Sequence, residues 1–131
     1  KEASTTPKAL YDANAWQVFC FGPGLISDGE IMVSEKTEVG GHKESNPRTA
    51  IACVEPGHYI IVVSDGRTEE SAGLSLLQLA EFLQKYNVSE AYNLDGGGSS
   101  VMVFNNQIIN KPTTDGRIRE RGISDIVYIG Y

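Results

Sequence analysis

Apolar residues along the chain fall into short runs separated by turn-forming residues, a pattern typical of a sheet-rich domain. Most of these runs are rich in β-branched or aromatic residues and predict strands at residues 16–21, 25–33 (two short strands around a Ser-Asp-Gly turn), 49–54, 59–64, 90–94, 99–104 with 107–110 as a hairpin, and 124–130. The run at 59–64 is continuously apolar, so we expect that strand to be buried on both faces and central in its sheet.

One segment, Ser75 to Tyr86, has a helical period. Its apolar side chains recur at intervals of three and four residues, at Leu76, Leu79, Ala80 and Leu83. Ser75 and Gln78 have the spacing of a capping box, and Asn87 is suited to the left-handed conformation that ends a helix. These signals predict one amphipathic helix with defined ends.

The strand at 59–64, this helix and the strand at 90–94 together predict a βαβ unit, in which a right-handed crossover joins two parallel strands. The expected fold class is therefore α+β: a mixed β-sheet containing one parallel βαβ unit, with few helices. Residues 1–15 are expected to form a lead-in segment with a helical turn, and residues 34–48 a long polar loop that is functional or mobile.

Asp65 and Asp95 each follow one of the two strands of this unit. If the strands are adjacent, about 4.8 Å apart, both carboxylates lie at the edge where open α/β sheets bind ligands. Carboxyl groups about 5 to 9 Å apart can act as acid and base, or as acid and nucleophile, at an acetal carbon. Alternatively, each aspartate caps its own Asp-Gly turn.

The stretch Gly96–Gly98 would allow a ligand to approach the backbone, and successive exposed N–H groups can form an anion-binding nest. Ser99 and Ser100 add hydroxyl donors beside it. Phosphate would also need cations, and guanidinium groups bind it through a planar fork. Arg48 and Arg67 adjoin predicted strand ends and are the better candidates, whereas Arg117 and Arg119 fit an exposed loop.

The chain has 131 residues and a net charge of −6, which disfavours nucleic acid as a partner, and it contains no apolar run of membrane-spanning length. Cys20 and Cys53 have no metal or redox spacing and are expected to be small buried hydrophobes, although a disulfide stays open. No leader is visible, and the first residue, Lys1, favours a chain trimmed from something longer.

No cofactor is expected, because no loop has metal-ligand spacing and neither His42 nor His58 has a partner at zinc-binding spacing. Calcium would suit clustered oxygen atoms, so a cation between Asp65 and Asp95 stays open at this stage.

Several motifs in order, "FGPGLI", "NPRTAI", "VVSDGR" with "SAGLSLLQLAEFL", "YNLDGGGSSVM" and "RGISDIVYIG", resemble the phosphodiester glycosidase family. The resemblance runs from about Trp16 to Tyr131, and these residues are similar to the C-terminal portion of that domain. It implies hydrolysis of a sugar-1-phosphate diester at the anomeric carbon, in cell-surface or secreted glycans. The expected location is extracellular or at the cell surface, in a bacterium.

The resemblance also implies that residues 16–131 pack with a missing N-terminal portion of the same domain, so catalysis is expected of the full-length protein rather than of this portion alone. By position, it implies catalytic roles for Arg48 and Arg67 on the phosphate and for Asp65 and Asp95 as acid/base or nucleophile. The substrate-binding residues that it implies are Asn46, Thr49, Gly66, Ser71, Gly73, Asn93, Gly96, Gly97, Gly98, Ser99, Ser100, Arg121 and Ser124.

Two other functions stay open. The same residues could form a non-catalytic module that binds phosphorylated glycans, or they could support glycosyl transfer during exopolysaccharide assembly. The sequence leaves the sugar, the stereochemical outcome and the oligomeric state undetermined.

Overall fold

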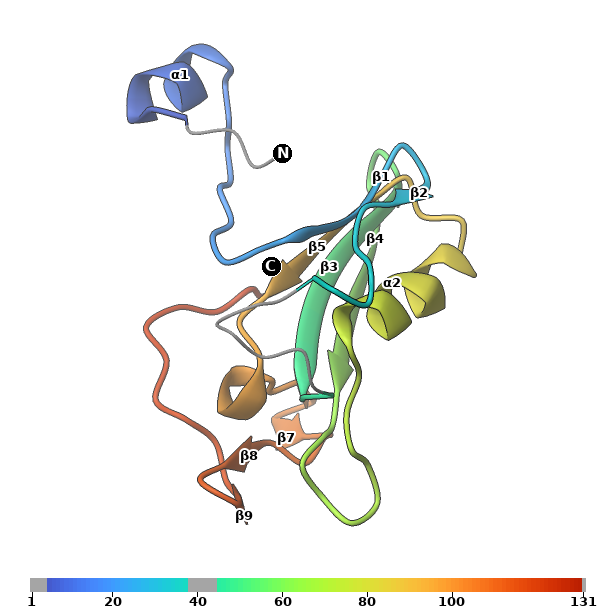
Figure 1. Ribbon diagram of the computed structural model, residues 1–131. Coiled ribbons are helices and arrows are strands. Elements are labelled where there is room, and N and C mark those ends of the chain that lie inside the picture. The colour runs from blue at the N-terminus through green and yellow to red at the C-terminus, as the bar shows by residue number, and fades with distance from the viewer. Residues whose placement is uncertain (1–4, 38–44, 131) are drawn as a thin grey trace.

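The chain folds around one five-stranded sheet with a helix on one face (Figure 1). The computed structural model describes residues 5–37 and 45–130. The first residues of the lead-in segment, most of the predicted polar loop including His42, and Tyr131 lie outside the described residues.

The sheet consists of strands in the order β2-β1-β5-β3-β4, and every neighbouring pair is antiparallel. Their bounds are β1 Gly24–Ser27, β2 Glu30–Ile31, β3 Arg48–Glu55, β4 His58–Ser64 and β5 Glu90–Leu94. Two small hairpins follow, one from β6 Val103–Phe104 and β7 Gln107–Ile108, the other from β8 Thr113–Thr114 and β9 Arg117–Ile118.

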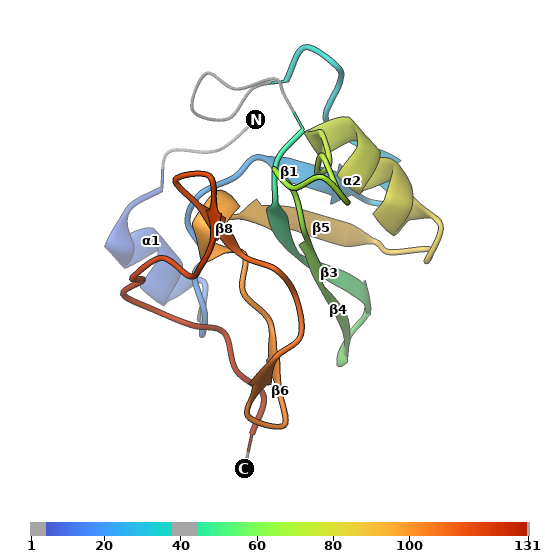
Figure 2. The ribbon, with the colours of Figure 1, turned by 90° about the horizontal axis from the view of Figure 1, so that it is seen from below.

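The helices are α1 Pro7–Asp12 and α2 Leu76–Gln84, with a 3₁₀ turn, η1, at Gly97–Ser99. Helix α1 confirms the helical turn predicted in the lead-in segment, but it has no buried residue and stands apart from the sheet in Figures 1 and 2. Neither helix in the described ranges has the length and apolar character needed to cross a bilayer.

The α+β class is confirmed, but the parallel βαβ unit is wrong. Strand β3 lies between β4 and β5 and is antiparallel to both. Strands β4 and β5 do run in the same direction, yet β3 separates them, so they lie two strand spacings apart, roughly 10 Å. The sequence pattern does not say which strand is inserted between them. Here β3 and β4 form a hairpin, and β5 then pairs with the free edge of β3.

Strand β4 is the outermost strand rather than a central one. Its apolar run serves both faces: Ile60 and Val62 pack against the core, whereas Ile61 and Val63 are partly exposed on the opposite face. A run of branched residues therefore predicted the strand correctly but not its position in the sheet.

Helix α2 covers one face of the sheet, called the helix face below. Its buried residues pack against β1, β5 and the centre of β3, forming a core of Leu25, Ile26, Val33, Ala50, Ala52, Leu76, Leu79, Ala80, Leu83, Val88 and Ala91. The capping box is confirmed: Gln78 N donates to Ser75 Oγ (3.1 Å) and Ser75 N to Gln78 Oε1 (2.9 Å). Asn87 has the expected left-handed φ of 54°.

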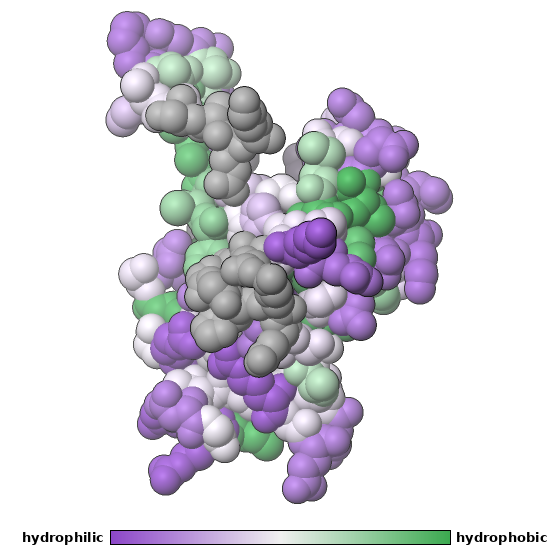
Figure 3. Space-filling model, viewed as in Figure 1, coloured by the Kyte–Doolittle hydropathy of each residue, from purple (hydrophilic) through white to green (hydrophobic). Residues whose placement is uncertain are grey.

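Two predicted strands do not form. Residues 16–21 and 124–130 pair with no strand among the described residues, and both segments expose large side chains, with Trp16 92% and Ile129 89% accessible. The apolar connection between α1 and the body of the molecule is visible in Figure 3. Cys20 is exposed and Cys53 partly exposed, and both are free thiols, so the expectation of two buried cysteines is wrong for Cys20.

The packing of α2 generates a stability prediction. We expect Leu79→Ala to lower the free energy of unfolding by about 3 kcal/mol, because the side chain is fully buried and its removal leaves a cavity. Glu81→Ala, on the exposed side of the same helix, is the control and should change it by less than about 0.5 kcal/mol. Urea denaturation measures both, and equal effects of the two variants would contradict this packing.

Candidate functional site

The site is built around Pro47, which is fully buried at the start of β3. A β-carbon on Gly66 would lie 2.6 Å from Pro47 N, and one on Gly96 would lie 2.7 Å from Pro47 O. Since Gly66 follows β4 and Gly96 follows β5, the two glycines close on Pro47 from either side. A β-carbon on Gly73 would likewise clash with the Asn46 backbone, at 2.4 Å.

The triple-glycine turn is packed rather than open. Its amides donate within the protein: Gly96 N to Asp95 Oδ1 (2.8 Å) and Gly97 N to Pro47 O (3.0 Å), while Ser99 N and Ser100 N donate to carbonyls inside the turn. Gly97 and Gly98 are buried. The predicted nest of successive exposed N–H groups is therefore not formed, because Gly96 N, Gly97 N, Ser99 N and Ser100 N all donate within the protein.

The two aspartates lie on different faces of the sheet. Side chains alternate along a strand, and Ala91 and Asn93 of β5 are buried on the helix face, so Asp95 continues the helix face. Val62 of β4 also lies on the helix face, so the same alternation assigns Asp65 to the opposite one. Among the described residues the two carboxylates have no partner in common: Asp65 binds Asn110 and Lys111, whereas Asp95 lies beside Arg121.

Asp65 anchors the segment that follows the turn. Its Oδ1 accepts from Lys111 N (2.7 Å) and Asn110 Nδ2 (3.1 Å), and Asn110 also donates to Ser100 O (2.8 Å). Hydrogen bonds to a charged acceptor are stronger than neutral ones. Asp65 therefore ties residues 100–111 to the end of β4.

Asp95 is more open to solvent, with 49% of its side chain accessible. Its Oδ2 lies 3.9 Å from Arg121 Nη1. The carboxylate thus stands beside a cation at the end of the helix face.

Three arginines converge at this end of the sheet. A β-carbon on Gly97 would lie 3.1 Å from Arg121 Nη2 and 3.3 Å from Arg67 Nη1, so both guanidinium groups cover the same turn. Arg67 is fixed by Asn46 Oδ1, which accepts from its Nε (3.0 Å) and Nη2 (2.7 Å). Figure 3 shows that hydrophilic residues predominate at the end of the molecule where β8 and β9 lie in Figure 1.

Arg48 is the buried member of this group, at 6% accessibility, and its Nε donates to Leu74 O (3.0 Å). Burial, and to a lesser extent the neighbouring Arg67 guanidinium, lower the pKa of Arg48 below the usual arginine value. Both causes disfavour the charged form of the Arg48 guanidinium.

Three buried polar atoms also lack partners, two of them at the glycine turn. Asn93 Oδ1, Ser99 Oγ and Thr114 Oγ1 are buried and have no hydrogen-bond partner among the described residues. The amide of Asn93 does donate, from Nδ2 to Gly22 O (2.7 Å). Buried polar atoms are nearly always satisfied, so the unpartnered hydroxyls of Ser99 and Thr114 at the turn are consistent with a ligand site.

Other predicted residues have structural contacts. Ser71 Oγ donates to Asp65 O (3.0 Å), and Thr49 Oγ1 donates to Ser100 Oγ (3.0 Å) on the opposite face. Ser124 is exposed and donates to Asp125 beside it, so no contact among the described residues joins it to the arginines.

Four residues that support the site were not predicted from the sequence: Asn110, Lys111, Thr113 and Thr114. Thr113 Oγ1 donates to Gly66 O (3.0 Å), which joins the β8–β9 hairpin to the turn after β4. The signal for this hairpin was Asp115-Gly116, both of which have positive φ in the turn.

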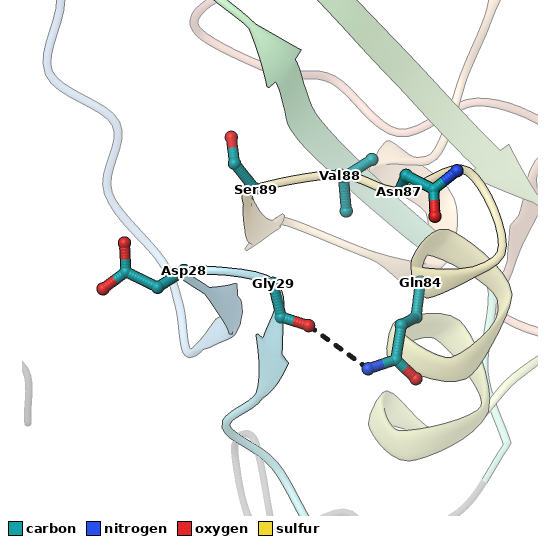
Figure 4. A pocket seen from close by; sticks show the side chains of 6 residues that line it. All are labelled: Asp28, Gly29, Gln84, Asn87, Val88 and Ser89. Atoms are coloured by element: carbon teal, nitrogen blue, oxygen red, sulfur yellow. Dashed lines mark hydrogen bonds between the residues drawn. The ribbon is translucent and has the colours of Figure 1, made fainter.

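The described residues include no group of three or more His, Cys, Asp or Glu side chains that could hold a metal ion. A hollow of about 310 Å³ lies at the other end of β5, lined by Asp28, Gly29, Gln84, Asn87, Val88 and Ser89 (Figure 4). Gln84 Nε2 donates across it to Gly29 O (3.2 Å). No arginine lines this hollow. It lies at the N-terminal end of β5, whereas the arginine cluster lies at the C-terminal end of that strand.

Comparison with known proteins agrees with the motifs. The family model for phosphodiester glycosidase matches residues 2–130. The chain belongs to the phosphodiester glycosidase family. This confirms the resemblance carried by the "NPRTAI" and "NLDGGGSS" motifs, which contain the Pro47 contact and the glycine turn.

Two sequence relatives and one solved structure illustrate the family. The human N-acetylglucosamine-1-phosphodiester alpha-N-acetylglucosaminidase is 36% identical over 101 residues, covering 68% of this chain and 19% of the human protein. A prophage-derived uncharacterized protein of Bacillus subtilis is 30% identical over 122 residues, covering 93% of this chain and 18% of that protein. The catalytic domain of the zebrafish N-acetylglucosamine-1-phosphodiester alpha-N-acetylglucosaminidase, auto-inhibited by its pro-peptide, superposes with a TM-score of 0.61 at 32% identity.

The zebrafish match covers 76% of this chain and 38% of the zebrafish chain. The chain thus spans about a fifth of the human relative and less than half of the zebrafish catalytic-domain chain.

The packing of the turn can be tested at Gly98. A β-carbon there would lie 1.9 Å from Thr114 Oγ1, so we expect Gly98→Ala to lower the free energy of unfolding by about 2 kcal/mol through overpacking. Thr114→Ala removes the clashing oxygen and should recover part of the loss in the double variant. Thermal unfolding of the single and double variants measures the coupling, and strictly additive losses would argue against this contact.

Proposed function

We propose that the protein containing this chain hydrolyses a sugar-1-phosphate diester at the anomeric carbon, with the arginine cluster binding the phosphate. The observation that carries the proposal is the position of Arg67 and Arg121, whose guanidinium groups cover one turn beside Asp95. The first substrate to test is an N-acetylglucosamine-1-phosphate diester, because the human and zebrafish relatives are named for that activity.

The arginine cluster supports phosphate binding because its charges are concentrated and held in place. The whole chain carries −6, yet Arg48, Arg67 and Arg121 meet at one end of the sheet. Asn46 and the Leu74 carbonyl fix two of them. Prepositioned cations stabilise developing charge without reorganisation during the reaction.

Cleavage of the sugar-1-phosphate bond requires only one catalytic carboxylate from this chain, Asp95. Cleavage of the bond between the anomeric carbon and oxygen leaves the electron pair on a phosphate monoester, whose second pKa is about 6, so this leaving group needs charge stabilisation more than protonation. Asp95, on the same face as the buried Arg48, is placed to act on the sugar as nucleophile or base. Asp65 acts as a structural anchor in this proposal.

We also propose that further polypeptide from the N-terminal portion of the same domain completes the site. The face of the sheet opposite α2 carries partly exposed apolar side chains, among them Ile51, Ile61 and Tyr92. Trp16 and the segment 126–129 are also strongly exposed. Exposed large apolar side chains that gather on one surface are typical of an interface. It is also consistent with the small share of each relative that this chain spans.

In this proposal the protein acts on phosphorylated glycans, either outside the cell or at the cell surface of a bacterium. This rests on the resemblance to the family, and the similarity to an uncharacterized protein of Bacillus subtilis supports a bacterial source.

Activity of the full-length protein tests the proposed roles. We expect Asp95→Asn to lower kcat/KM by about 10³-fold or more and Arg121→Ala by about 10² to 10³-fold, because each removes a group that acts in the transition state. Release of free sugar from the phosphodiester measures both. Arg119→Ala, which removes an exposed arginine paired with Asp115, is the control and should retain activity.

Asp65→Asn separates anchoring from chemistry. It should lower the melting temperature by several degrees, since it weakens hydrogen bonds to a charged acceptor, while the folded protein keeps most of its turnover.

Full turnover in Asp95→Asn would remove Asp95 from the mechanism. Binding of a phosphorylated glycan by the wild type without any product would favour the binding module, and diversion of product by an added glycan acceptor would favour transfer.

Burial of Trp16 tests the completion of the domain. In this chain Trp16 is 92% exposed, so Trp16→Asp should be nearly neutral unless other polypeptide covers it. We expect it to lower the stability of the full-length protein by about 3 kcal/mol. Tyr11→Asp, at an 81% exposed aromatic residue of α1, is the matched control. Equal, small effects in thermal denaturation would contradict coverage of Trp16.

A further inference from the structure

Strand β4 forms one edge of the sheet, and no strand in the described part of the chain pairs with its outer side (Figure 1). Two contacts of β3 show which way the backbone groups point. Cys53 O accepts from Ser89 N (2.8 Å), which directly precedes β5. Arg48 N donates instead to Ser64 Oγ of β4 (3.0 Å). Because backbone groups alternate sides along a strand, the even-numbered residues of β3 and β4 bond to each other, and the odd-numbered residues of β4 face outward.

The outward-facing residues of β4 are Tyr59, Ile61 and Val63, which present a row of backbone N–H and C=O groups. Natural edge strands are usually protected from pairing by lysine, proline or a bulge. Residues 59–63 contain no charged residue and no proline, although the chain carries −6. The one register shift between β3 and β4 lies between Cys53 and Glu55, beyond this row. The edge therefore has none of these protective features.

We propose that this edge pairs with the same edge of a second copy of the chain, joining two five-stranded sheets across a twofold axis at Ile61. A twofold interface uses one surface on both copies, and the outward row is symmetric about its central residue. In this register Ile61 lies opposite the partner's Ile61, and Tyr59 lies opposite the partner's Val63. Each such pair brings outward N–H and C=O groups face to face. The inference does not rest on the proposed function.

The side chains of β4 also match in this register. On the face opposite α2, Tyr59 would lie beside the partner's Val63, and on the helix face Ile60 would lie beside the partner's Val62. Pairs of aromatic and β-branched residues stabilise neighbouring strands, and like charges placed opposite each other destabilise them. Here every pair is uncharged. Tyr59 is 59% exposed and the next four residues are partly exposed, so pairing would remove apolar surface from water.

The twofold axis would keep the two candidate sites apart. Gly66 of the site lies five residues beyond Ile61, so the corresponding positions of two copies would be separated by about ten strand residues, roughly 30 Å. Each site would then belong to one copy, and association would not be needed for turnover. Association and activity can therefore be tested separately.

Amide hydrogen exchange and sedimentation equilibrium of the full-length protein test the pairing. We expect a dimer with a Kd on the order of 10 μM, because a single strand pair is a small interface. The amides of Tyr59, Ile61 and Val63 should be protected well above this concentration and lose protection on dilution, as the fraction of dimer falls.

Proline substitutions test the backbone contact directly. Ile61→Pro removes an outward N–H but no hydrogen bond to β3, and it should weaken association at least about tenfold. Tyr59→Pro should do the same, and it lies near the start of β4, where proline is better tolerated. Ile61→Val keeps the N–H and is the control that should associate like the wild type. Circular dichroism establishes that each variant is folded.

Other outcomes overturn the proposal. Protection that persists on dilution of a monomer would assign the edge to a strand of the same polypeptide. No protection at either concentration would leave the edge unpaired. A dimer that survives both proline substitutions in folded protein would use another surface. Absence of phosphodiester hydrolysis, with association intact, would reject the hydrolase proposal alone.

Discussion

The site depends on close contact between Pro47 and the glycines that follow β4 and β5. Neither Gly66 nor Gly96 could carry a β-carbon without meeting the backbone of Pro47, and a third glycine, Gly73, packs as closely on Asn46. Since a backbone clash cannot be relieved by turning a side chain, these positions tolerate little change. The free-energy cost of ordering glycine is offset by this packing rather than by ligand contact.

The same contact explains how the arginines meet. Residue 48 directly follows Pro47, residue 67 directly follows Gly66, and the turn begun by Gly96 supports Arg121, whose backbone N donates to Gly98 O (3.1 Å). Holding three backbone segments around Pro47 thus places three cations at one end of the sheet. The pleat then separates the aspartates, with Asp95 on the helix face near Arg48 and Asp65 on the other.

The sequence was sufficient to predict the main helix, its capping box and the strands that flank it, since each depends on local pattern. It also identified the motifs that gather at the site. It could not determine that β3 lies between β4 and β5, because strand order depends on pairing between distant segments. This one error made Asp65 and Asp95 appear adjacent. The nest was wrong for a related reason: glycine indicates close approach, and here the approaching group is Pro47.

Rigid placement of the arginines matters for the proposed chemistry. Arg48 is buried and near Arg67, and both conditions lower its pKa. A flexible cluster would relax by moving the side chains apart, but Asn46 and the Leu74 carbonyl hold them. The free-energy cost of holding these like charges close together is therefore met during folding, and the positive field is in place before substrate binds. Phosphate gains most from such a site as charge accumulates on it, which is the condition for accelerating its departure rather than only binding it.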